Sequence, residues 1–150
     1  MITTIKEFKL YENINSNKIR VVRWSKEKIL AKDLKPQKTN WGGFDMDGLC
    51  FVPYTDTNDW RYDMWKNETE KYHKQKMYPN NYILDISMLP YDTEDKLIKL
   101  SRESYSSNID IRKNVDNILN DMKIYITLSG NEIVEFRILK DSKVKIIDDI

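Results

Sequence analysis

One glutamate near the end of the chain combines a charged side chain with an apolar strand pattern. In the alternation of residues 132–139, Glu132 shares a face with three apolar side chains, Val134, Phe136 and Ile138. A carboxylate on an apolar face is costly unless it is paired or hydrogen-bonded, so a functional reason for it is expected. A fixed negative charge can stabilise positive charge that develops in a transition state. The alternative is a glutamate at the entry of a hairpin, exposed to water, whereas Glu135 falls on the polar face.

Arg23 is the second candidate, because it is a fixed cation in an apolar strand. It shares a strand face with Ile19 and Val21, so its guanidinium is expected to be partly buried. The planar guanidinium suits a carboxylate or a phosphate. Two interpretations stay open: Arg23 binds an anionic ligand, or it pairs internally with an acid such as Asp85 or Glu132.

The glycines are concentrated at two places in the chain. Three of the four lie within residues 41–48, in an expected loop over residues 37–48, and Gly130 precedes the candidate glutamate. Glycine permits unusual backbone shapes or a close approach to a ligand, although two tight turns would also explain it. The spacing matches neither a P-loop nor a dinucleotide motif. Trp41 and Tyr54 flank the loop and are the expected stacking surfaces for a planar ligand.

No metal site is expected. Residues 45–48 (Asp-Met-Asp-Gly) lack the remaining ligands of a calcium loop and are better interpreted as a pair of loop acids. One cysteine, Cys50, and one histidine, His73, cannot form a zinc site. Nothing in the sequence supports them as a nucleophile pair either, since His73 lies among lysines.

Composition indicates one domain over residues 1–150 in a reducing compartment. The formal net charge is +1, so nucleic acid is possible but not favoured as a partner. The single cysteine excludes an internal disulfide. No run is apolar enough for a membrane helix, and no signal peptide is visible, so a cytoplasmic location is expected. Richness in Lys, Asn and Ile indicates an AT-rich genome, bacterial or phage; in the latter case the location would be the host cytoplasm.

Hydrophobic periodicity predicts an α+β fold. Period-2 patterns predict strands over residues 18–24, 49–54, 81–88, 123–128, 132–139 and 143–147. In the third of these, four side chains are expected to face one way: Tyr82, Leu84, Ile86 and Met88. A hairpin is expected across residues 129–131.

Helical patterns are predicted over residues 57–72, 93–104 and 110–122, with a helical turn in 26–33. The first is expected to be capped by Asp56 or Thr57, and the second by Asp92 or Thr93. The third carries one buried stripe, formed by Ile111, Val115, Ile118, Leu119 and Met122. A capping box over residues 4–7 indicates a short helical arm within residues 1–15.

Three segments resemble the ADP-ribosyltransferase superfamily, in the order of that family. Residues 131–136 (Asn-Glu-Ile-Val-Glu-Phe) are similar to the closing strand that carries the catalytic glutamate. Residues 19–25 are similar to the first core strand, which ends in an Arg or His that reaches NAD. Residues 48–53 are similar to the following Gly-Ile-Tyr-Phe strand, except that Cys50 stands at the tyrosine position. The Ser-Thr-Ser and Glu-x-Glu motifs of other branches are absent.

The resemblance implies a split mixed β-sheet core with flanking helices and NAD as substrate. The implied activity is mono-ADP-ribosyl transfer to a macromolecular acceptor, expected to be a protein. Glu132 would support the ribosyl cation and Arg23 would anchor the dinucleotide. The other implied NAD-binding residues are Trp24, Ser25, Trp41, Gly43, Phe51 and Tyr54.

A second hypothesis follows from Cys50 at the tyrosine position and from the missing Ser-Thr-Ser motif. The chain would then be a catalytically degenerate binding or inhibitor protein on the same fold, acting by protein–protein interaction. A third hypothesis, a small RNA-binding domain, predicts binding that falls steeply with salt.

Overall fold

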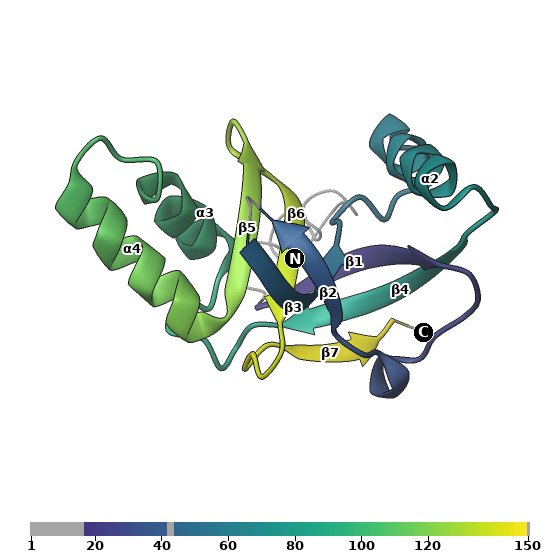
Figure 1. The fold of residues 1–150 in the computed structure, drawn as a ribbon, viewed down its shortest axis with the longest axis horizontal. Coiled ribbons are helices and arrows are strands. Elements are labelled where there is room, and N and C mark those ends of the chain that lie inside the picture. Colours follow the sequence, from purple (N-terminus) through teal and green to yellow (C-terminus); the bar gives the residue numbers. More distant parts are fainter. Residues whose placement is uncertain (1–16, 42–43, 150) are drawn as a thin grey trace, which may run out of the picture.

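The strands of this protein form two separate antiparallel sheets. The computed structural model describes residues 17–41 and 44–149. Within that range the fold is α+β, with three α-helices and a single 3-10 turn, η1 (Ala31–Asp33), in the stretch expected to be helical. Figure 1 shows α3 and α4 together beside β5, and α2 apart from them. No helix in the described stretches has the length and apolarity that crossing a bilayer requires. The predicted N-terminal arm lies outside them.

The first sheet places β4 (Tyr78–Asp85) between β1 (Lys18–Ser25) and β7 (Lys145–Asp148). The predicted inward row of β4 is confirmed for Tyr82, Leu84 and Ile86, which are at most 1% exposed. It is wrong for Met88, which is 58% exposed. The strand ends at Asp85, and a turn follows in which the Leu89 N–H donates to the Ile86 carbonyl.

The second sheet has the order β2-β3-β6-β5, and all its pairs are antiparallel. Its strands are β2 (Gln37–Trp41), β3 (Phe44–Phe51), β5 (Ile124–Ser129) and β6 (Glu132–Leu139). The hairpin across residues 129–131 is confirmed. The loop expected over residues 37–48 is wrong, because residues 37–41 and 44–48 belong to two paired antiparallel strands. The acids expected in that loop lie within β3. The expected mixed sheet is also wrong for the described strands.

The two sheets are joined at one point. Val22 of β1 and Val52, just after β3, exchange backbone hydrogen bonds of 2.9 and 3.1 Å. Both side chains are buried. This bridge brings the end of β1 beside the end of β3, although the two strands belong to different sheets.

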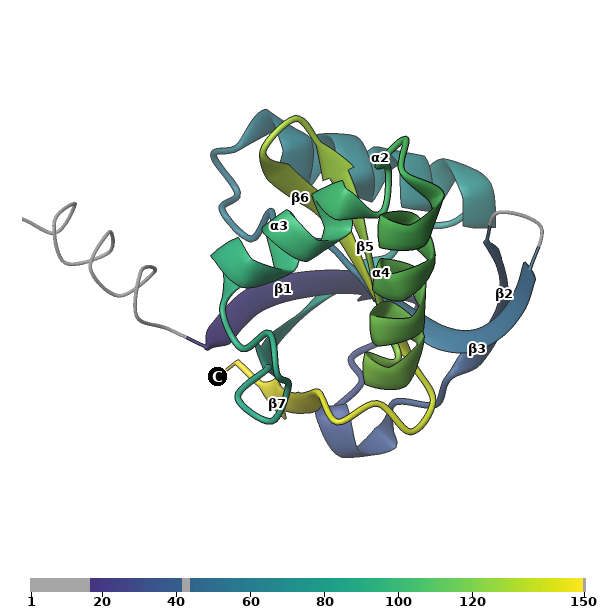
Figure 2. The ribbon, with the colours of Figure 1, turned by 90° about the vertical axis from the view of Figure 1, so that its left-hand side faces the viewer.

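Helices α3 (Glu94–Glu103) and α4 (Ile109–Met122) pack beside β5 (Figures 1 and 2). The Thr93 hydroxyl caps α3, as one of the two predicted caps, by accepting from the Lys96 N–H. Most of the predicted stripe of α4 is buried or partly buried. Ile111 is the exception at 43% exposure, because no residue of the first turn of α4 is buried.

The helices and sheets enclose a main core and a smaller cluster. The main core joins α3 and α4 to both sheets, and its fully buried members include Val21, Phe51, Tyr82, Leu97, Val115, Ile124 and Phe136. The smaller cluster lies around the bridge between the sheets and contains Val22, Trp24, Val52, Tyr54 and Met77. Tyr62 and Trp65 of α2 pack against this cluster from outside.

Helix α2 (Trp60–His73) is attached to the molecule by few side chains. None of its residues is buried, and Tyr62 makes an edge contact with Trp24, at 5.2 Å between ring centroids. The cap predicted at Asp56 or Thr57 is wrong. Asp59 is the cap and accepts from the Arg61 N–H at 2.9 Å, while Asp56 accepts from the Asn58 N–H in the preceding turn. The helix therefore begins three residues later than expected.

Candidate functional site

A cavity of about 780 Å³ opens where the end of β1 faces α2 and the end of β3. This volume lies within the range usual for small-molecule sites, about 300–1,000 Å³. Its walls come from segments far apart in the sequence. The residues used below are Arg23, Trp24 and Ser25 of β1, Cys50 of β3, Trp65 of α2 and Glu135 of β6.

Arg23 lines this cavity as a half-buried cation. Its Nη1 donates a hydrogen bond of 3.3 Å to the carbonyl of Cys50. The two internal partners considered from the sequence are engaged elsewhere: Asp85 accepts from the Ser87 N–H, and Glu132 pairs with Arg61. None of the ion pairs in the described part of the chain involves Arg23. Burial lowers the pKa of the guanidinium, because it disfavours the charged form. An anionic ligand beside Arg23 would offset this cost.

A bulge in β6 explains why Glu132 does not lie on the apolar face. Leu128 pairs with Ile133 but Thr127 pairs with Glu135, so Val134 has no partner across the hairpin. The extra residue shifts the alternation of the strand. Ile133 therefore joins Phe136 in the main core, and the Glu132 side chain is 66% exposed. The prediction that Glu132 shares the apolar face was wrong.

Glu135 is the carboxylate that the bulge places at the cavity. The expectation of a solvated polar face was wrong, because its side chain is only 14% exposed. The Arg137 guanidinium, 8% exposed, lies 3.4 Å from it. A Glu-x-Arg pair within an apolar strand was the available signal, since residues two apart share a face. Glu135 was not among the residues predicted to form the site.

Cys50 lies beside this carboxylate. Burial and a hydrogen bond with Glu135 raise the pKa of the thiol to about 12. A thiol needs its thiolate form to attack an electrophile, so Cys50 is a poor nucleophile at neutral pH. His73 also lines the cavity.

Two tryptophans on the cavity wall have unsatisfied donors. The indole nitrogens of Trp24 and Trp65 are shielded from solvent and have no hydrogen-bond partner among the described residues. A buried donor without an acceptor costs about 1–3 kcal/mol. Two such donors on one wall, beside an unpaired cation, favour a ligand rich in acceptor atoms.

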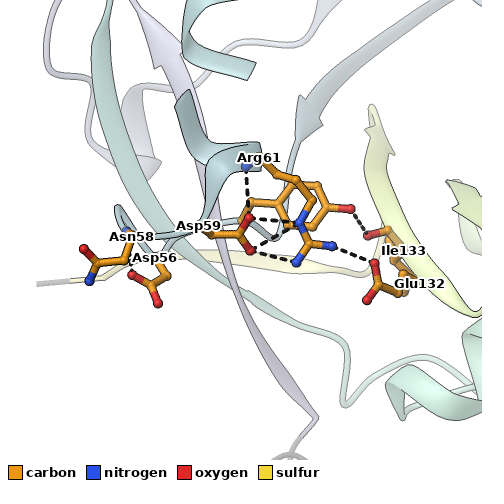
Figure 3. A network of polar contacts seen from close by, with 7 residues as sticks. Asp56, Asn58, Asp59, Arg61, Glu132 and Ile133 are labelled. Carbon is orange, nitrogen blue, oxygen red and sulfur yellow. Dashed lines mark hydrogen bonds and ion pairs between the residues drawn. The ribbon is translucent and has the colours of Figure 1, made fainter. Parts of the chain in front are cut away.

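Glu132 belongs to a second, smaller pocket of about 300 Å³. Arg61 Nη1 donates to the Glu132 carboxylate at 2.6 Å, while Nη2 donates to Asp59 at 2.7 Å (Figure 3). The guanidinium also lies 4.2 Å from the centroid of the Tyr54 ring, within the range of a cation–π contact. Arg61 thus connects the start of α2 to the tip of the β5–β6 hairpin.

This network fixes its members electrostatically. Hydrogen bonds from Arg61 hold the pKa of the Asp59 carboxyl below its usual value. Burial raises the pKa of Tyr54, whose hydroxyl donates to the Ile133 carbonyl at 3.3 Å. Arg61 therefore pairs with both acids, and the three side chains together carry a net charge of −1.

The structure distributes the residues expected to bind NAD. Arg23, Trp24 and Ser25 line the large cavity, while Tyr54 and Glu132 line the small pocket. Phe51 is 1% exposed in the main core, Trp41 pairs with Phe44 in the β2–β3 hairpin, and Gly43 lies outside the described residues.

The protein is an α+β domain. Its large cavity carries a cation, Arg23, that suits an anionic ligand. Within residues 17–41 and 44–149, no three His, Cys, Asp or Glu side chains gather in a way that could hold a metal ion. Comparisons with protein-family models, with curated proteins and with solved structures find no match for this chain. The functional argument therefore depends on the site itself.

Proposed function

We propose that this chain binds NAD in the large cavity and transfers ADP-ribose to a macromolecular acceptor, expected to be a protein. One observation carries the proposal: Arg23, without an acidic partner, and the carboxylate of Glu135 line the same cavity. A cation for the phosphates and an anion for the ribosyl cation are the two charges that this reaction needs.

In the proposed reaction, a nucleophile of the acceptor forms a bond to the ribose C1′ while the bond from C1′ to nicotinamide breaks. The bonding electron pair leaves with nicotinamide and neutralises its ring charge, and the acceptor loses a proton to solvent. Positive charge develops on the ribose, where a nearby carboxylate stabilises the transition state. Glu135 is the better placed carboxylate for this role, since it lines the same cavity as Arg23 whereas Glu132 lines the other pocket.

The finer fold assignment belongs to this proposal. A split sheet with flanking helices is what the resemblance to ADP-ribosyltransferases implies. The two sheets joined at Val22 and Val52 support it, because this bridge sets the first matching segment against the second. The antiparallel pairing of the described strands departs from the expected mixed sheet.

NAD binding by calorimetry tests the proposal, with nicotinamide release followed in the same samples. Arg23→Ala should abolish both. Arg20→Ala is the matched control, because Arg20 lies on the same strand but is 71% exposed and pairs with Asp149. Absence of NAD binding by the wild-type protein would overturn the proposal.

A pair of glutamine variants tests which carboxylate acts. Glu135→Gln should slow nicotinamide release by about 10²–10³-fold, as expected for a transition-state electrostatic contact. Glu132→Gln should leave the rate within a few-fold of wild type. The reverse result would return the role to Glu132, as the resemblance to the family implied.

A catalytically inactive binding protein is the second candidate. Helix α2 favours it, because Trp60 and Tyr72 are 71% and 83% exposed, and Tyr72 also lines the cavity. Such surface aromatics are frequent in protein interfaces. Capture of a partner that survives the double change Arg23→Ala and Glu135→Gln would support this function. Capture that requires NAD would count against it.

A further inference from the structure

We propose that the indole N–H groups of Trp24 and Trp65, together with Arg23, form an oxyanion-binding wall in the large cavity. The ligand class is a phosphate or pyrophosphate group. The inference rests on the proposed function only in using the same cavity. It adds Trp65, which neither the sequence motifs nor the resemblance suggested, and it gives Trp24, which the resemblance implied, a specific role as a donor.

The two indole N–H groups lack hydrogen-bond acceptors within the described chain. An indole nitrogen can only donate, so it needs an acceptor. Trp24 is 7% exposed, and its ring makes a T-shaped contact with the ring of Tyr62. Neither its N–H nor that of Trp65 meets an acceptor within the described chain. Buried polar groups in native proteins are rarely left unpaired, so a ligand oxygen is the natural partner.

The cavity also carries a positive charge, that of Arg23. Arg23 follows the same strand into the cavity and spends one of its donors on the Cys50 carbonyl. Two carboxylates line this cavity: Glu135 is paired with Arg137, and Glu27 is exposed beside the exposed cation of Lys26. One uncompensated cation and two neutral donors match a phosphoryl group, which offers several acceptor oxygens and a negative charge.

An oxyanion can reach the indole nitrogens only if the cavity wall moves. Both indole nitrogens are covered, so an oxyanion reaches them only after a small shift of the wall. Helix α2, which carries Trp65, has no buried residue and packs on the smaller cluster through Tyr62 and Trp65, so it can shift more easily than the helices of the main core. A ligand that bridges Trp24 of β1 and Trp65 of α2 would hold the helix against the sheet.

The test is a titration of ¹⁵N-labelled full-length protein, observed at its four tryptophan indole signals. The probes are inorganic pyrophosphate, AMP and ADP. Two indole signals, assigned through Trp24→Phe and Trp65→Phe, should shift on addition of pyrophosphate or ADP. The signal of Trp60, on the exposed face of α2, should stay in place. No shift of either assigned signal with any probe would overturn the inference.

Affinity separates recognition from packing. Phenylalanine keeps an aromatic ring but removes the donor, so each variant should bind ADP about fivefold to tenfold more weakly. Trp60→Phe should bind as wild type does. The midpoint of urea unfolding should not fall in Trp65→Phe, because an unsatisfied donor has been removed. Unchanged affinity in both variants would overturn the inference, whatever their stability.

The same samples separate this inference from the proposed function. Pyrophosphate binding with the two indole shifts, but without nicotinamide release from NAD, would keep the oxyanion wall and reject the transferase. Nicotinamide release, together with wild-type affinity for ADP in both variants, would keep the transferase and reject the oxyanion wall. Binding of pyrophosphate alone would indicate a free anion as ligand, and tighter binding of ADP would indicate a nucleotide.

Discussion

At the residue scale, burial raises the pKa of Cys50 and lowers the pKa of Arg23. The thiol keeps its proton, because burial and Glu135 both oppose the thiolate. The guanidinium keeps its charge despite burial, because even a lowered arginine pKa stays far above neutral pH. The cavity therefore carries a permanent cation and an inert thiol.

The thiol should react slowly with alkylating reagents. A rise of the Cys50 pKa from 9.0 to about 12 lowers the thiolate fraction at pH 8 by about a thousandfold. Iodoacetamide labelling of the native chain should therefore be about a thousandfold slower than labelling in urea. Equal rates would mean that the thiol is not shielded by its surroundings.

The same shift predicts a loss of stability in alkali. The folded state holds the Cys50 proton more tightly than the unfolded state does. This contribution is fully present below pH 9 and is lost as the pH rises towards 12. Urea midpoints of wild type and Cys50→Ala, measured at pH 7 and pH 10.5, should change so that the wild type loses more stability. A parallel decline would contradict the assignment.

Arg23 should cost stability in the absence of a ligand. Replacing this unpaired, half-buried cation by methionine should raise the free energy of unfolding by about 1 kcal/mol or more. The exposed Arg20→Met should show no such gain. Urea denaturation measures both. A clear loss in Arg23→Met would indicate that its contact with Cys50 is structural.

At the element scale, the β5–β6 hairpin depends on one backbone conformation. Gly130 has φ +60°, and a Cβ there would meet no atom within 4 Å. The cost of Gly130→Ala is therefore conformational alone, about 1–2 kcal/mol in unfolding free energy. Gly130→Asn should cost less, because asparagine tolerates this region. Thermal unfolding of the two variants measures the difference, and equal stability of alanine and wild type would contradict it.

Local patterns predicted elements that depend on their own residues. The strand at 18–25, the helices α3 and α4 and the 129–131 turn all carry periodicity, a cap or a glycine that acts within a few residues. Strand β2 was missed because its residues, Gln-Lys-Thr-Asn-Trp, show no apolar face. Its pairing with β3 supplies the order that its composition does not.

The candidate site was predicted in part. Arg23 was found because a fixed cation interrupts an apolar strand. Glu135 was missed because a bulge at Val134 is set by pairing with β5 and leaves no mark on the alternation. The orphan donors of Trp24 and Trp65 are tertiary facts, since an indole lacks a partner only once its neighbours are placed.

At the scale of the whole molecule, stability is unevenly distributed. The main core buries side chains from both sheets and from α3 and α4, while α2 rests on the small cluster. Leu119→Ala, in α4 and 4% exposed, should lower the free energy of unfolding by about 2–5 kcal/mol. The exposed Asn114→Ala in the same helix is the control and should change it little.

Amide exchange should follow the same division. The amides of α2 should exchange faster than those of α4, because no residue of α2 is itself buried whereas α4 buries three. Hydrogen–deuterium exchange with peptide resolution measures this. Saturating ADP should slow exchange in α2 if the helix closes on the ligand. Equal protection of the two helices in the free protein would contradict this division.

The order of strands has a consequence for synthesis. Strand β3 pairs with β6, about eighty residues later, and β4 pairs with β7, whose last residue is Asp148. A ribosome adds about 5–20 residues each second, so both strands wait several seconds for their partners. Meanwhile the apolar row of β4 and the edge of β3 are open to other chains. The nascent protein should therefore depend on a chaperone until its final strand has emerged.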